Sequence, residues 1–181
     1  MFKYVKESQV TITELMLPSH SNFSGKIHGG YILNLMDQIA FACASKHSRH
    51  YCVTASVNKV DFLNPIDVGD LVTLKASVNF TGRTSMVVGV RVESENIRTG
   101  KKRHCNSSYF TMVAKDEKGK NVSVPGLIIE TEQGVRRFAR SIARQEQAKN
   151  RISQFKQSEF KIQNHIESLK AHNVKLDLIG K

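Results

Sequence analysis

The chain has 181 residues, of which 40% are hydrophobic and 24% charged, and its formal net charge is +11. This balance is typical of a folded domain of ordinary size with an appendage, and it excludes a disordered chain. No apolar run is long enough to span a bilayer, and the beginning of the chain lacks the apolar segment of a signal peptide. We therefore expect a cytoplasmic protein without a membrane span.

The basic excess is densest after residue 130. A basic surface can bind nucleic acid, an anionic membrane or a polyanionic small molecule, and composition does not choose among them. The three cysteines, Cys43, Cys52 and Cys105, form no C-x-x-C pair, which argues against a disulfide framework and a cysteine zinc site. Cys43 and His47 lie four residues apart. We interpret them as a small buried thiol beside a surface histidine, with a nucleophile pair as the alternative.

Loose alternation over residues 2–17 predicts an opening strand, which Pro18 ends. A polar, glycine-rich run then leads into a helix from about Gly29 to Ser48. After the helix come four segments with strand composition, separated by short turns that favour antiparallel hairpins. These segments cover residues 51–62, 70–80, 84–97 and 102–115.

This order of elements predicts an α+β fold in which a strongly curved antiparallel sheet wraps one long helix. With only one helix, the other face of the sheet stays open, which favours dimerisation. From residue 131 to about 172 the chain is rich in charged residues and alanine, and we expect one or two amphipathic helices. A heptad-like stripe runs through them: Ala148, Ile152, Phe155, Ile162, Ile166 and Leu169. We expect these helices to dock on the body or on a neighbouring subunit rather than to form a true coiled coil. The alternatives are a solvated basic helix without a ligand and, less favoured, contact with nucleic acid or a membrane.

Asp37 interrupts an apolar stretch over residues 31–44. Apolar residues occupy nearly every face of the predicted helix, so we expect the helix and its carboxylate to be buried. A buried carboxylate is costly unless a partner or a chemical task keeps it there. Asn34 and Gln38 share its face of the helix. The alternative is that Asp37 only satisfies a buried hydrogen bond.

The helix is preceded by Asn22, His28 and the glycines Gly29 and Gly30. Free backbone N–H groups at a helix start can stabilise a developing oxyanion, and glycines let a substrate approach closely. The alternatives are that Asn22 caps a turn and that the glycines allow tight packing. His28 alone, without a placed partner, is weak support for a catalytic histidine.

The pattern Asn22-x-x-Gly25-x-x-x-Gly29-Gly30, followed by Leu35-Met36-Asp37, resembles the signature of hotdog-fold acyl-CoA thioesterases of the cytosolic acyl-CoA hydrolase type. Further matching blocks follow in order at residues 53–57, 60–65, 68–72 and 82–86. The resemblance covers about residues 8–127. It implies a thioesterase domain over residues 1–127, with a basic helical extension over residues 128–181.

The resemblance implies hydrolysis of a fatty acyl-CoA to a free acid and coenzyme A, with no metal and no cofactor. Asp37 matches the acid that activates water as general base or attacks as nucleophile. Asn22 matches the asparagine that polarises the thioester carbonyl, and the Gly30 N–H matches the oxyanion donor. Thr54 is expected to position the water. Asn22 and Asp37 would come from opposite subunits of a homodimer, with three such dimers forming a hexamer.

Arg83, Thr84 and Ser85 match the family segment that contacts coenzyme A. The alternative for these three residues is an ordinary hairpin start after Gly82. The basic run from Arg98 to Arg103 is expected to form an exposed hairpin turn with a solvated role, the alternative being a phosphate clamp.

Two rival functions stay open. One is another hotdog enzyme, a hydratase or dehydratase, although Asp37 has no histidine at a matching position. The other is a non-catalytic module that binds acyl-CoA, or RNA through the basic tail. Neither the acyl chain length nor regulation by a nucleotide follows from the sequence.

Overall fold

The computed structural model describes residues 1–154, 166 and 172–175. The chain forms two compact units, residues 1–142 and residues 143–181, and each is described by itself. Of the predicted hydrophobic stripe, Phe155, Ile162 and Leu169 lie outside the described residues. Within those residues, no helix is both long and apolar enough to cross a membrane.

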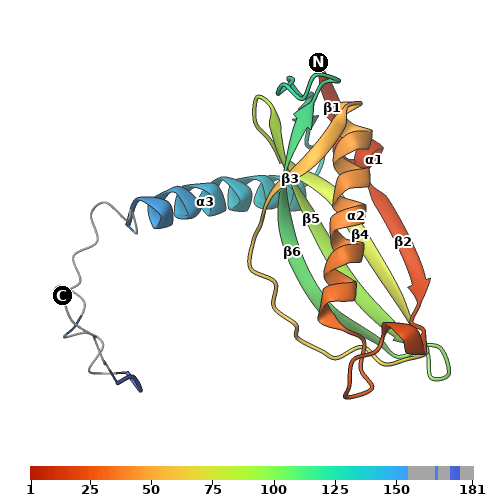
Figure 1. Ribbon diagram of the computed structural model, residues 1–181. Helices are drawn as coiled ribbons and strands as arrows, with labels where there is room; N and C mark the ends of the chain where they lie inside the picture. The colour runs from red at the N-terminus through yellow and green to blue at the C-terminus, as the bar shows by residue number, and fades with distance from the viewer. Residues whose placement is uncertain (155–165, 167–171, 176–181) are drawn as a thin grey trace. The chain divides into compact units, whose positions relative to one another are not determined.

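The elements follow one another in chain order as in Figure 1. They are β1 (Phe2–Tyr4), α1 (Val5–Ser8), β2 (Val10–Leu15), the 3-10 helix η1 (Pro18–His20), α2 (Gly29–Ser48), β3 (Tyr51–Val57), β4 (Asp70–Thr81), β5 (Ser85–Asn96), β6 (Lys102–Lys115), β7 (Gly126–Ile128) and α3 (Glu132–Gln154).

Five strands form one antiparallel sheet in the order β2-β4-β5-β6-β3, and β1 pairs with β7 in a small parallel ribbon. In Figure 1 the sheet curls around α2, which crosses one of its faces. A long helix held in a curled antiparallel sheet is the hotdog fold, so the predicted fold is confirmed. Two of the consecutive links are hairpins, β4–β5 and β5–β6, as their short turns predict.

The core lies between α2 and the inner face of the sheet. Alternate residues of β4 and β5 point inward and are buried, as the period of a strand requires. They meet the buried side of α2, whose Met36 and Ile39 are at most 1% exposed. Burying a side chain of this size contributes about 1.5–3 kcal/mol. This face of α2 is therefore anchored firmly, and it fixes the direction in which the opposite face points.

The opposite face of α2 is exposed. Asn34, Asp37, Gln38 and Phe41 all lie on it. The expectation that Asp37 is buried is therefore wrong for the single chain, because one curled sheet covers only one side of a helix. A helix that is apolar on most of its circumference still needs a second surface to cover the exposed apolar residues.

The predicted strands differ from the structure at two places. The opening segment is broken into β1, the short helix α1 and β2, because residues 5–8 form a helical turn whose Glu7 side chain accepts a hydrogen bond from the Tyr4 N–H. The strand predicted from residue 51 ends at Val57, beyond which an irregular segment leads to Asp70. The helix over residues 29–48 and the strand over residues 102–115 have the bounds that the sequence predicts.

Cys43 and His47 do not form a nucleophile pair. Burial raises the pKa of the Cys43 thiol to about 12, the opposite of what a reactive thiolate needs. The surface position expected for His47 is wrong, because its ring is fully buried and its Nε2 lies 2.9 Å from the carbonyl oxygen of Pro125. The backbone carbonyl of His47 also accepts a hydrogen bond from the Lys3 ammonium at 2.6 Å. These contacts fasten the beginning of the chain and the segment before β7 to the end of α2.

Burial, the largest cause, and the nearby Lys3 charge lower the pKa of His47, although its hydrogen bond to Pro125 opposes them. The unfolded chain therefore binds a proton below about pH 6.5 that the folded chain refuses. We expect stability to fall as the pH drops from 6.5 to 5, by at most about 1.4 kcal/mol per pH unit from this residue. His47→Gln keeps an N–H for Pro125 and should flatten that slope in urea titrations. His50→Gln, which changes an exposed histidine, should leave the slope as it is, and an unaltered slope in His47→Gln would contradict the assignment.

Candidate active site

Asn22 lies in a tight loop between η1 and α2. The Ser21–Ile27 bridge closes the loop, and the Asn22 N–H donates to the carbonyl of Lys26 at 2.7 Å. The Asn22 side-chain oxygen accepts three hydrogen bonds, from the Ser24 N–H (3.0 Å), the Ser24 hydroxyl (2.7 Å) and the Lys26 N–H (3.2 Å). Because these donors hold the oxygen, the amide is oriented, and its NH2 group makes no hydrogen bond within the described part of the chain. The half-buried Asn22 NH2 group can therefore donate hydrogen bonds to a ligand.

Asn22 lines a cavity of about 420 Å³ beside the start of α2. Apolar side chains make up most of its wall, with Cys105 of β6 among them. The wall residues that matter here are Ile27, Ile32, Phe62 and Ile66. Such a cavity has the size of a small-molecule site, and its few polar lining residues include Asn22 and Lys26.

Gly30 lies in the first turn of α2, where its N–H donates to Nδ1 of His28 at 2.9 Å. His28 therefore caps the helix, and this bond requires the Nδ1 position to be unprotonated. A side chain at position 30 would start 3.0 Å from the imidazole, which is why glycine suits this position. The N–H predicted to donate to an oxyanion is thus bonded to a neighbouring ring in this structure. Gly29, whose N–H has no acceptor in residues 1–154, lines the cavity of Asn22.

Asp37 lies on the exposed face of α2, where a hydrogen bond from β3 holds its carboxylate. The Thr54 hydroxyl of β3 donates to its carboxylate at 2.6 Å and also lies 3.4 Å from the sulfur of Met112. Asp37 and Thr54 line a second, more open cavity of about 550 Å³, together with Gln38, Phe41, Tyr51, Cys52 and Val53. The structure therefore brings two of the predicted site residues, Asp37 and Thr54, into direct contact.

The two halves of the predicted site are separate in one chain. Asn22 and Gly29 line one cavity and Asp37 the other, with no lining residue in common. Asp37 follows Gly30 by seven residues of a continuous helix, which places it about 10 Å along the axis at a rise of about 1.5 Å per residue. Asp37 consequently cannot reach a carbonyl group held at its own Gly30 N–H.

Arg83 and Thr84 form the turn between β4 and β5, and Ser85 begins β5. Neither cavity is lined by these three residues. Their position follows from the register, because Met86 pairs with Met112, which in turn pairs with Thr54. The turn therefore lies two strands, roughly 10 Å, from Thr54 across the sheet. Arg83 is exposed and can contact a ligand that extends from the Asp37 side.

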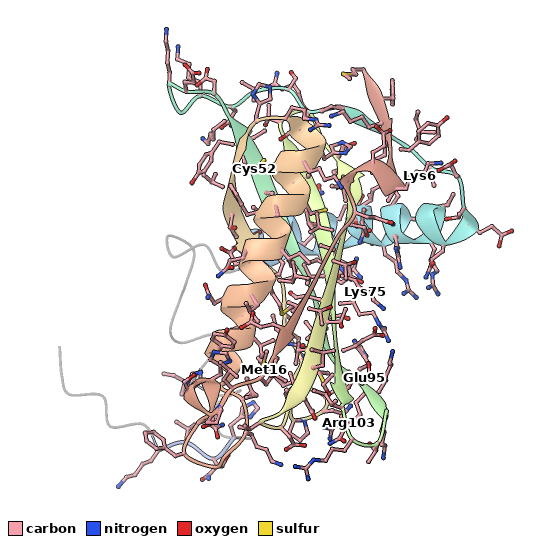
Figure 2. The ribbon with its side chains drawn as sticks, turned by 90° about the vertical axis from the view of Figure 1, so that its right-hand side faces the viewer. Lys6, Met16, Cys52, Lys75, Glu95 and Arg103 are labelled. Atoms are coloured by element: carbon pink, nitrogen blue, oxygen red, sulfur yellow. The ribbon has the colours of Figure 1, made fainter. Side chains whose placement is uncertain are left out.

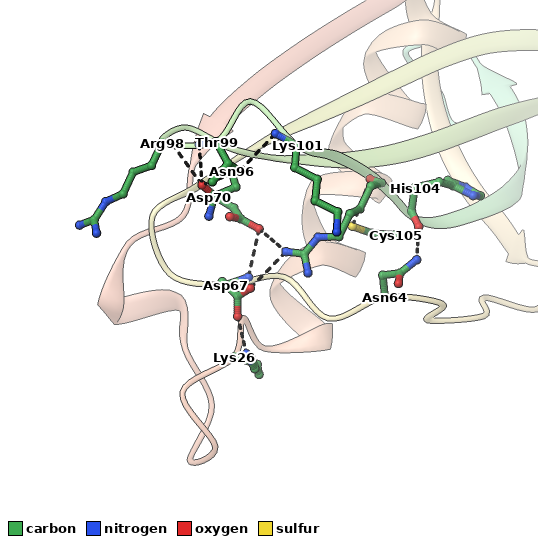
Figure 3. Close-up of polar contacts among 11 residues, drawn as sticks. Lys26, Asn64, Asp67, Asp70, Asn96, Arg98, Thr99, Lys101, His104 and Cys105 are labelled. Carbon is green, nitrogen blue, oxygen red and sulfur yellow. Dashed lines mark hydrogen bonds and ion pairs between the residues drawn. The ribbon is translucent and has the colours of Figure 1, made fainter.

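The basic run ahead of β6 divides into two parts. Arg98 and Lys101 lie in an exposed turn that the side chain of Asn96 caps, as predicted. The solvated role expected for Arg103 is wrong, because its guanidinium bonds the carboxylates of Asp67 (3.1 Å) and Asp70 (2.9 Å). Figure 3 shows Asp67 between Asp70 and Lys26, whose ammonium also pairs with Asp67. No pattern along the chain indicated this network, because the residues that its ion pairs join are 33 to 41 positions apart.

A metal site is not evident in the described residues, which contain no group of three or more histidine, cysteine, aspartate or glutamate side chains able to hold an ion. The site instead consists of an oriented amide, helix-start N–H groups and an exposed carboxylate with a hydroxyl partner. Groups of these kinds, in a hotdog fold, are chemically suited to act on an activated carbonyl group.

Comparison with known proteins agrees with this class. Residues 24–101 match the model of the thioesterase superfamily. Protein VdlD of Helicobacter pylori is 41% identical over 139 residues, which are 77% of this chain and 79% of that protein. The uncharacterized acyl-CoA thioester hydrolase YkhA of Bacillus subtilis is 37% identical over 149 residues, which are 82% of this chain and 87% of that protein. A rat cytosolic acyl coenzyme A thioester hydrolase is 33% identical over 90% of this chain and 41% of its own. The chain belongs to the thioesterase superfamily.

Solved structures extend the similarity to three dimensions. A hexameric acyl-CoA thioesterase superposes with a TM-score of 0.81 at 42% identity, covering 83% of this chain and 96% of that one. An acyl-CoA hydrolase from Staphylococcus aureus superposes with a TM-score of 0.80 at 32% identity, covering 94% of this chain and 99% of that one. That hydrolase was solved in complex with butyryl coenzyme A, coenzyme A and coenzyme A disulfide. Alanine variants of that hydrolase at one asparagine, one aspartate and one threonine have also been solved. Those residues have the same spacing as Asn22, Asp37 and Thr54.

His28 is expected to matter as a helix cap. His28→Ala removes the acceptor for the Gly30 N–H and should lower the free energy of unfolding by about 0.5–2 kcal/mol, measured by urea titration. His28→Asn can restore a side-chain cap and should recover most of that loss. Equal stability of the alanine variant and the unaltered chain would show that the hydrogen bond contributes nothing.

Proposed function

We propose that this protein hydrolyses fatty acyl-CoA thioesters to a free acid and coenzyme A, at sites shared between two copies of the chain. The observation that carries the proposal is the separation within one chain of Asn22 from an exposed Asp37 that is already bonded to Thr54. A twofold dimer would bring Asn22 of one copy opposite Asp37 of the other and would create two equivalent sites. The exposed face of α2 would be covered at the same time.

The chemistry needs negative charge to be stabilised on the carbonyl oxygen as water adds to the thioester. The free NH2 group of Asn22 donates to that oxygen, and the Gly30 N–H donates once the His28 ring has turned away. Removing one such donor typically slows an enzyme by about 10²–10³. Asp37 of the other copy takes the proton from water, and Thr54 orients the carboxylate or the water. Direct attack by the Asp37 carboxylate is the alternative course, with hydrolysis of the resulting anhydride as a second step.

The remaining contacts concern the coenzyme A part and the assembly. The turn that holds Arg83, Thr84 and Ser85 lies two strands from Thr54, the partner of Asp37. These residues offer charge-assisted and neutral hydrogen bonds to the phosphates of coenzyme A. Assembly of three dimers into a hexamer is supported by the hexameric structural relative. A cytoplasmic location is supported by the rat relative named as cytosolic. A hydratase is disfavoured, since His28, beside the glycines, serves as a helix cap.

Two substitutions test the assigned roles. Asp37→Asn removes the base, and Asn22→Ala removes the carbonyl donor, so each should lower kcat by about 10²–10³ in a thiol-release assay with a panel of short, medium and long acyl-CoAs. Asn22→Asp keeps the oxygen that organises the loop while replacing the NH2 donor, and it should be as slow as the alanine variant. Asn34→Ala, on the same exposed face of α2, is the matched control and should retain activity. Hydrolysis by Asp37→Asn at the unaltered rate would contradict the mechanism.

Sharing of the site between copies has its own test. When the inactive Asn22→Ala and Asp37→Asn chains are unfolded together and refolded as a mixture, half of the dimers should be mixed, and each mixed dimer holds one intact site. Activity should recover to about a quarter of the unaltered level. The same treatment of either variant alone provides the control. A mixture as inactive as its components, with mixed dimers verified by mass spectrometry, would mean that each site lies within one chain.

A further inference from the structure

We infer that Asp67, held by Arg103, is a positioning residue that sets the place of Asn22 through Lys26. The inference rests on the catalytic role proposed for Asn22. The sequence singled out neither Lys26 nor Asp67 as a site residue, and Asp67 and Arg103 lie outside the wall of the Asn22 cavity, which Lys26 lines. In the structure, the loop that carries the Asn22 amide lies beside a network of ion pairs that is attached to the sheet.

The first link joins the Asn22 loop to residue 67. Lys26 contacts Asn22 twice, since its N–H donates to the Asn22 side chain at 3.2 Å and its carbonyl accepts from the Asn22 N–H at 2.7 Å. Lys26 also pairs with Asp67 as an isolated bridge, and its ammonium pairs with the Asp67 carboxylate. The neighbouring Ile27 N–H donates to the carbonyl of Ile66 at 2.9 Å. The position of Asn22 therefore follows the position of Asp67.

The second link joins Asp67 to the sheet. Arg103 of β6 bonds both Asp67 and the buried carboxylate of Asp70, which is only 1% exposed and begins β4. The Asp67 N–H also points to Asp70, at 3.3 Å. Lys26, the larger influence, and Arg103 lower the pKa of Asp67, so the carboxylate stays charged at neutral pH. Figure 3 shows Lys26, Asp67 and Asp70 lying one after another between the loop and the strand ends.

Positioning is the role that fits these contacts. The Asn22 oxygen is held only by atoms of its own loop, from residues 24 and 26, so the loop moves as a body and its anchor decides where the NH2 group points. A displacement of about 1 Å at a catalytic group can cost about 10² in rate. The loss should appear in kcat, because ground-state binding of the coenzyme A part does not depend on the amide.

A double-mutant cycle provides the test. Asp67→Ala should lower kcat about 10- to 100-fold with little change in KM. In the Asn22→Ala background, the same substitution should change kcat less than about twofold, because the group that it positions is already gone. Circular dichroism and thermal unfolding of each variant verify folding, and Asp67→Asn, which keeps the polar atoms, serves if the alanine variant does not fold.

Glu93 supplies the matched control. Its carboxylate also pairs with two cations, Lys75 at 2.8 Å and Arg91 at 2.8 Å, and its exposure is similar to that of Asp67. In Figure 2, Lys75 lies farther up the sheet than Arg103, away from the end that carries the network. Glu93→Ala removes as many ion pairs as Asp67→Ala but touches no residue of the Asn22 loop, so it should leave kcat within about twofold.

The outcomes separate this inference from the proposed function. If Asn22→Ala is slow while Asp67→Ala matches Glu93→Ala, the positioning role is wrong and the catalytic assignment stands. The same conclusion follows if Asp67→Ala lowers kcat by an equal factor in both backgrounds. If Asn22→Ala hydrolyses acyl-CoA at the unaltered rate, both the catalytic assignment and the positioning role are wrong.

Discussion

One constraint governs this protein: a single curled sheet can bury only one side of the long helix it holds. The inner face of α2 packs against β4, β5 and β6 and is closed to solvent, with Met36 at 0% exposure. The outer face carries Asp37 together with the aromatic ring of Phe41, both exposed. A carboxylate in such a place is solvated and costs little in the single chain. When a second surface covers this face and excludes water, the electrostatic interactions of the carboxylate with a bound ligand become stronger.

The same packing divides the reacting groups. The start of α2 presents helix-start N–H groups and the oriented amide of Asn22, both of which stabilise negative charge. Two helical turns farther on lies Asp37, the proposed base, already bonded to a hydroxyl of β3. Since the helix is rigid and continuous, these groups never meet within one chain. The proposed mechanism therefore ties catalysis to assembly, and it links the apolar surface of α2 to the proposed activity.

The ion pairs of Lys26, Asp67, Asp70 and Arg103 anchor the loop around Asn22 to the sheet. Loops carry reactive groups in many enzymes, and their precision depends on what anchors them. Here the anchor is electrostatic: Arg103 neutralises the buried Asp70 and holds Asp67, which in turn holds Lys26. Removing Arg103 would leave the buried Asp70 carboxylate without its ion-pair partner, which is costly. The buried Asp70 therefore fixes Arg103, and Arg103 in turn fixes Asp67.

Local patterns in the sequence determined much of this protein. Helical spacing and strand composition predicted α2 and β6 at their observed bounds, and ordered motifs indicated Asn22, Gly30, Asp37 and Thr54 as residues of one site. Burial of Asp37 and solvation of Arg103 were predicted wrongly, since hydropathy and charge along the chain do not reveal which side a sheet covers or which distant carboxylate an arginine meets. Only the tertiary structure decided that Thr54 bonds Asp37, that His28 occupies the Gly30 N–H, and that Asn22 lies in a separate cavity. These facts depend on contacts between segments far apart in the chain, which only the packing of helix against sheet brings together.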